Sequence, residues 1–61
     1  MPIVQIEMLE GRTLDQKREL VKRVTEAITE SLKCPKDAVR IVIREMKKEN
    51  FARADKLAID E

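Results

Sequence analysis

The residues of this chain that could carry out chemistry are few. The 61-residue sequence contains no histidine, tyrosine or tryptophan, and it has one cysteine, one phenylalanine and one glycine. A Gly-rich phosphate loop needs several glycines, so none is predicted. No zinc site is predicted either, because there is no histidine, the cysteine is alone and the sequence shows no cluster of metal ligands. A catalytic base would therefore have to be a carboxylate, a lysine or the amino terminus.

The amino terminus is the most distinctive of these candidates, because the chain begins MPIVQI. If Met1 is removed, the Pro2 nitrogen becomes a secondary amine held in a rigid ring. A free α-amino group has a pKa of about 7.7–8.0, and desolvation or nearby cations lower such a pKa further. A neutral Pro2 nitrogen could then act as a general base. By composition alone, a proline that merely starts a strand is the more frequent interpretation.

The other candidates also have ordinary structural interpretations. Cys34 has no histidine to activate it, so a small buried or loop residue is favoured over a nucleophile. Arg40 and Arg44 share a face of a predicted strand, and either could merely pair with acids of a neighbouring strand. We assign Arg44 this structural role, and the role of Arg40 stays open at this point. Arg12 would be unfavourable beside a helix N-terminus, which favours a functional role. Phe51 would ordinarily belong to a core.

A strand, a helix and a second strand must position these residues. Ile3 to Leu9 alternates apolar and polar side chains, as a strand does, and the single glycine, Gly11, marks a turn. Residues 13–16 read as a capping box that begins a helix, which Pro35 ends. Ala38 to Met46 is the second predicted strand.

The predicted helix is amphipathic. Its opposite face, which includes Lys17, is expected to be a solvated row of charges. Its apolar stripe is formed by Leu20, Val21, Val24, Ala27, Ile28, Ser31 and Leu32.

Strand, helix and strand together predict an α+β fold, a βαβ unit with parallel strands and a right-handed crossover. Residues 1–61 make a single domain, and the segment from Phe51 to Ile59 adds a short hairpin or an extended tail. One helix leaves a face of the sheet uncovered, and a chain this short is only marginally stable alone. Because an intrachain disulfide is impossible with one cysteine, we expect the chain to form a homo-oligomer.

The charge balance excludes other classes of function. Thirteen basic and twelve acidic residues give a net charge of +1, so we expect no nucleic-acid partner. The apolar runs are too short to span a membrane, and the N-terminus lacks a signal-peptide pattern. The expected location is the cytoplasm.

Several motifs in register resemble the 4-oxalocrotonate tautomerase family. The first is MPIVQI, followed by Leu9-Glu10-Gly11-Arg12-Thr13 and Asp15-Gln16-Lys17. The likeness continues without gaps through the helix, Val39-Arg40, Glu45-Met46 and Phe51. It therefore covers most of the chain.

The resemblance implies a function for four residues. Pro2, exposed after removal of Met1, would be the catalytic base that moves a proton in an unsaturated 2-oxo acid or a 2-hydroxydienoate such as 2-hydroxymuconate. Arg12 and Arg40 would bind and polarise this dicarboxylate, and Phe51 would line the site. The family forms a trimer of dimers, a homohexamer in which neighbouring subunits complete each site. It uses no cofactor or metal, and it acts in aromatic hydrocarbon catabolism.

The chain departs from the family after Phe51, where Ala52-Arg53-Ala54-Asp55 replaces a glycine-rich turn. Alanine tolerates a positive φ poorly, so this tail is expected to turn differently. Arg53 adds a charge that could shift substrate preference. The dehalogenase branch of the family needs an extra glutamate in this region, which is missing here, so dehalogenation is disfavoured.

Two alternatives to an active tautomerase stay open. One is an oligomer of the same fold that binds a ligand or has a structural role without this activity. The other is an unprocessed, inactive form that retains Met1, in which the Pro2 nitrogen is an amide and cannot act as a base.

Overall fold

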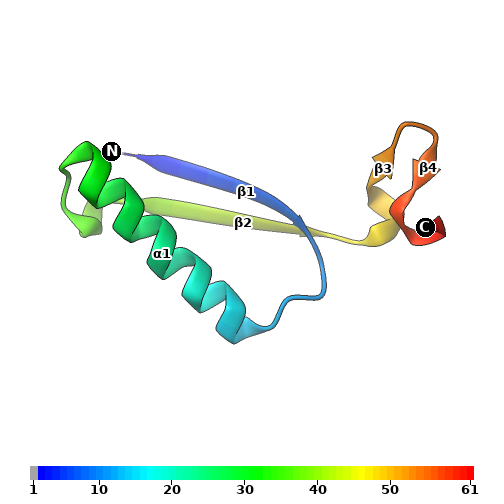
Figure 1. Cartoon of the computed structure of the whole chain (residues 1–61), viewed down its shortest axis with the longest axis horizontal. Helices are drawn as coiled ribbons and strands as arrows, with labels where there is room; N and C mark the ends of the chain where they lie inside the picture. Colours follow the sequence, from blue (N-terminus) through cyan, green and yellow to red (C-terminus); the bar gives the residue numbers. More distant parts are fainter. Residues whose placement is uncertain (1) are drawn as a thin grey trace.

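Two parallel strands lie side by side, and one helix crosses a single face of the pair (Figure 1). The computed structural model describes residues 2–61. In chain order the elements are β1 (Ile3–Leu9), α1 (Leu14–Leu32), β2 (Arg40–Met46), β3 (Ala52–Arg53) and β4 (Lys56–Leu57). The predicted βαβ unit with parallel strands is confirmed.

The two long strands begin and end together. Ile3 lies opposite Arg40, and Leu9 lies opposite Met46. The second strand is shorter than predicted, because residues 36–38 form a 3-10 turn that the Val39 N–H closes by donating to the Lys36 carbonyl oxygen (3.1 Å). This turn carries the chain from the helix down to the sheet.

Local sequence chemistry fixes both ends of α1. Gly11 has a φ of +123°, which an L side chain rarely adopts, and no atom would crowd a Cβ there, so conformation is the reason for the glycine. The Gln16 N–H donates to Thr13 Oγ1 (3.1 Å), and the Thr13 N–H donates to Gln16 Oε1 (2.9 Å), so the predicted capping box is confirmed. Lys33, with a φ of 57°, ends the helix before Pro35.

The predicted apolar stripe of the helix was partly wrong. Ala27, Ser31 and Leu32 are exposed. The last turn of the helix extends past the start of β1 (Figure 1). The half-buried side chains are instead Lys17, Leu20, Val21, Val24, Thr25, Ile28 and Thr29.

Lys17 was expected in solvent, but it bridges the helix and the sheet. Its Nζ lies 2.7 Å from Glu45 Oε1, and the two side chains are only 27% and 33% exposed. Glu45 follows Ile41 and Ile43 at a spacing of two residues, so it lies on the same strand face, which is turned toward the helix. The pair therefore ties the first turns of α1 to the end of β2.

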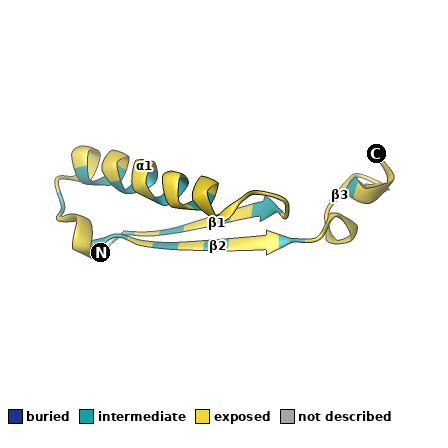
Figure 2. Ribbon diagram, turned by 90° about the horizontal axis from the view of Figure 1, so that it is seen from below, coloured by how far each residue is buried: buried dark blue, intermediate teal, exposed yellow. Residues whose placement is uncertain are grey.

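The sheet face away from the helix is uncovered (Figure 2). Among residues 2–61 no side chain is fully buried. Large apolar residues are left in solvent, with Ile3 66% exposed, Leu14 62% and Ile59 57%. None of the helices within the described residues is long and apolar enough to cross a membrane.

The C-terminal segment forms an antiparallel hairpin despite the loss of glycine. Ala52 pairs with Leu57, and Arg53 pairs with Lys56. Alanine was expected to avoid a positive φ here, but Ala54 itself adopts a φ of 57°. Steric crowding of its Cβ in this left-handed region costs roughly 1–2 kcal/mol relative to an ordinary φ.

We therefore expect Ala54→Gly to stabilise the protein, since glycine adopts a positive φ without this crowding. The gain, after the greater chain entropy of unfolded glycine is subtracted, is roughly 0.5–1 kcal/mol. Thermal unfolding at fixed protein concentration measures it. Ala52→Gly is the matched control: Ala52 lies in β3, so glycine there should lower the melting temperature. A fall for Ala54→Gly as large as that of the control would contradict this account.

Candidate functional site

The four residues that the sequence singled out lie at the two opposite ends of the sheet. Pro2 precedes β1 and Arg40 begins β2, so parallel pairing places both at the amino end of the sheet. Arg12 follows β1, and Phe51 follows β2 and a short turn, so both lie beyond its carboxyl end (Figure 1).

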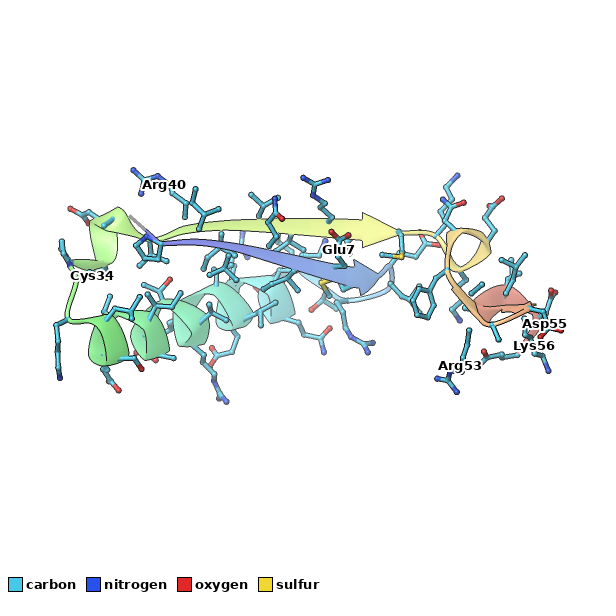
Figure 3. The ribbon with its side chains drawn as sticks, turned by 90° about the horizontal axis from the view of Figure 1, so that it is seen from above. Glu7, Cys34, Arg40, Arg53, Asp55 and Lys56 are labelled. Atoms are coloured by element: carbon cyan, nitrogen blue, oxygen red, sulfur yellow. The ribbon has the colours of Figure 1, made fainter. Side chains whose placement is uncertain are left out.

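At the amino end, the backbone holds Pro2 beside Arg40. The Arg40 N–H donates to the Pro2 carbonyl oxygen (3.0 Å), and the Pro2 side chain is half-buried. The exposed Arg40 guanidinium turns back on the chain, where its Nη1 donates to the carbonyl oxygens of Asp37 (2.5 Å) and Val39 (3.2 Å) (Figure 3). Met1 lies outside the described residues, so its removal remains a prediction.

At the carboxyl end, Arg12 sits in the short loop between Gly11 and the capping residue Thr13. Among residues 2–61 no carboxylate lies within 4.0 Å of its guanidinium, and the side chain is exposed. A cation at this position is disfavoured by the adjacent helix N-terminus, so its place in the loop does not follow from helix stability. Phe51, 44% exposed, stands at the base of the hairpin.

The two ends are too far apart for one chain to bring the four residues together. Seven strand residues at about 3.3 Å each separate them by roughly 23 Å. A surface hollow of about 290 Å³ includes none of the four, since it is lined by Val21, Lys22, Thr25, Glu26 and Lys36. The four side chains can meet only if the carboxyl end of one copy approaches the amino end of another.

Two further residues behave as their ordinary interpretations predict. Cys34 is a free, half-buried thiol in the turn after α1. Arg44 Nε lies 4.0 Å from Glu7 Oε2 on the uncovered face of the sheet, a loose contact that agrees with a structural role.

Sequence reasoning missed one interaction that bears on the site. The Lys17–Glu45 ion pair anchors the helix that immediately follows the Arg12 loop to the end of β2. The signal was present in the strand pattern, because Glu45 occupies the next position after Ile41 and Ile43 on the row that faces the helix, where a carboxylate partly shielded from water favours a cation partner. Lys17 is the cation one helical turn before the first half-buried leucine.

Comparison with known proteins gives consistent matches over nearly the whole chain. The sequence profile of the family described as tautomerase enzyme matches residues 2–60. A 2-hydroxymuconate tautomerase from Pseudomonas putida is 48% identical over 58 residues, covering 95% of this chain and 92% of that protein.

Solved structures agree with the sequence matches. A structure of the 4-oxalocrotonate tautomerase isozymes from Methylibium petroleiphilum has a TM-score of 0.91 and 45% identity, covering 95% of this chain and 91% of that one. A heterohexamer 4-oxalocrotonate tautomerase from Chloroflexus aurantiacus has a TM-score of 0.93 and 28% identity, with coverages of 98% and 97%.

Proposed function

The chain belongs to the 4-oxalocrotonate tautomerase family of enzymes, and we propose that it isomerises 2-hydroxydienoates or unsaturated 2-oxo acids without a cofactor. In this proposal the Pro2 nitrogen is the general base after Met1 is removed. The observation that carries the proposal is a similarity that begins at residue 2 and reaches 48% identity with a 2-hydroxymuconate tautomerase.

The proposed reaction moves one proton and leaves the composition of the substrate unchanged. A dienol becomes a conjugated ketone when its hydroxyl loses a proton and the terminal carbon of the diene gains one. The neutral Pro2 amine would accept the first proton and return it at the carbon. The rigid pyrrolidine ring limits the directions from which the nitrogen can act.

The two arginines supply the charge that such a substrate needs. A guanidinium binds a carboxylate through two parallel N–H donors, so Arg12 and Arg40 can hold the two ends of a dicarboxylate. Arg40 would also stabilise the negative charge that develops on the carbonyl oxygen as the dienolate forms. Phe51, at the base of the hairpin, would exclude water from this charge.

We propose that several copies of the chain assemble to build each site, as a homohexamer arranged as a trimer of dimers. Two observations support assembly: no side chain of residues 2–61 is fully buried, and the candidate residues occupy opposite ends of the sheet. Contact between the amino end of one copy and the carboxyl end of another would cover apolar surface and complete the site in one step.

Processed protein should convert 2-hydroxymuconate to its 2-oxo isomer, and an intact mass that lacks one methionine identifies the processed form. Pro2→Ala leaves a primary α-amine but removes the ring that orients it, so kcat should fall by up to about 100-fold, the lower end of the 10²–10⁴ that general base catalysis contributes. Arg40→Ala should also act chiefly on kcat. Ultraviolet absorbance of the dienol follows the reaction.

The wild-type rate should fall at acid pH, where the amine is protonated.

Circular dichroism and native mass should show the same fold and assembly for both variants, which separates loss of catalysis from loss of structure. Absence of any rate above the uncatalysed reaction between about pH 6 and pH 9, in protein shown to lack Met1, would exclude the tautomerase. The alternative of an inactive relative with the same fold would then hold.

Mixing two inactive variants should restore activity if Pro2 and Arg12 of one site come from different copies. Pro2→Ala and Arg12→Ala proteins are unfolded together and refolded at equal concentrations. Random assembly leaves about a quarter of the sites with both residues intact, so about a quarter of wild-type activity should return. A mixture of wild type with Pro2→Ala should retain about half. No recovery in the first mixture would show that one chain supplies both residues.

A further inference from the structure

The hairpin that follows Phe51 has one face that carries two positive charges, from Arg53 and Lys56. The ladder begins at Phe51, because the Ala58 N–H donates to the Phe51 carbonyl oxygen (2.8 Å) and Phe51 has extended backbone angles. Side chains alternate along a strand, so Phe51 and Arg53 lie on the same face, roughly 7 Å apart. Lys56, opposite Arg53, shares that face.

The stability of the hairpin does not explain this pairing. Like charges directly opposite each other on two strands are destabilising. Among residues 2–61 no carboxylate lies within 4.0 Å of Arg53 or Lys56, and both are exposed. In Figure 3 the Arg53 side chain extends away from Asp55 and Lys56, which lie at the tip of the hairpin.

Two arginines of α1 show the contrasting arrangement, in which an exposed guanidinium pairs with a carboxylate. Arg18 pairs with Asp15 at 2.8 Å, and Arg23 donates to Glu19 at 2.6 Å. The hydrogen bond from Arg23 lowers the pKa of the Glu19 carboxyl. Arg53 is therefore a free guanidinium, held on the rigid frame of a ladder beside the one aromatic residue.

We propose that Arg53 is a specificity-determining residue that binds, together with Arg12, the substrate carboxylate farther from Pro2. This inference rests on the proposed function, in which Phe51 lines the site. Arg53 follows Phe51 on the same face of the hairpin and lies beyond the same end of the sheet as Arg12. Two guanidiniums near one carboxylate favour dicarboxylate substrates over monocarboxylates.

Arg53 is a better candidate for this contact than Lys56. It lies two residues from Phe51 on the same strand, whereas Lys56 belongs to the return strand. Its planar fork also matches a carboxylate with two donors, which an ammonium cannot do. Lys56 contributes positive charge to the same face.

Binding of two unreactive dienoates tests this role without depending on turnover. Muconate has a carboxylate at each end, and sorbate has one; neither carries the 2-hydroxyl that would react. Arg53→Gln should weaken muconate binding about tenfold and sorbate binding less than twofold, measured by calorimetry at fixed salt. Arg53→Lys should recover part of the muconate affinity, because it restores the charge without the fork.

Arg18→Gln is the matched control, because it removes the same charge from an exposed helical position far from the hairpin. It should change neither affinity. Equal losses for both ligands in Arg53→Gln, unchanged muconate binding, or a wild type that does not prefer muconate to sorbate would each overturn the role of Arg53.

Turnover of 2-hydroxymuconate by the same proteins separates this inference from the proposed function. Wild type that binds muconate through Arg53 but gives no turnover would contradict the isomerase alone. If wild type converts 2-hydroxymuconate, and the Arg53→Gln variant still prefers muconate to sorbate as strongly as wild type does, only the role of Arg53 would be contradicted. If both proposals hold, Arg53→Gln should raise KM for 2-hydroxymuconate and change kcat little.

Discussion

The structure depends on one constraint: a single helix can cover only one face of a two-stranded sheet. Within residues 2–61 there is no second α-helix to place on the other face, and no side chain is fully buried. Ile3 and Val42 point away from the helix into solvent. A stable interior of ordinary packing density requires apolar surface from elsewhere, and further copies of the chain can provide it. The proposed assembly is therefore needed to bury apolar surface, whether or not it also completes the catalytic site.

The same constraint explains why the proposed site is divided. Parallel strands must start at one end and finish at the other, so residues before the strands are separated from residues after them by the length of the sheet. Pro2 and Arg40 belong to the first group, and Arg12, Phe51 and Arg53 belong to the second. In the proposed site, the base, Pro2, and the anion-binding residues Arg12 and Arg53 are far apart within one chain. They can become neighbours only across an interface between two copies. In this account catalysis and assembly are a single property of the fold.

Sequence reasoning succeeded where a local interaction determines the structure. The turn at Gly11 and the two strands follow from backbone freedom and from the alternation of side chains, and both were confirmed. Sequence reasoning failed where contacts between different secondary-structure elements determine the position of a side chain or the conformation of the backbone. The Lys17–Glu45 bridge needs the helix and sheet to be placed first. Ala54 accepts a positive φ because the paired strands on either side hold it there, which a propensity scale does not register.

The family motif also limited what the sequence could establish about the site. It identified Pro2 and Arg12 one by one, but their separation along the sheet became visible only in three dimensions. The charge of Arg53 was evident in the sequence, whereas its position on the same face as Phe51 required the pairing of the hairpin.

The central claim is that the Pro2 nitrogen is a free amine that accepts the proton. The most direct measurement is a pH titration of protein labelled with nitrogen-15 in proline, followed by nuclear magnetic resonance. The account predicts that the Pro2 resonance shifts with pH and that its midpoint coincides with the midpoint of the rise in kcat/KM. A Pro2 resonance that stays at an amide position at every pH, in protein that still catalyses the reaction, would contradict it.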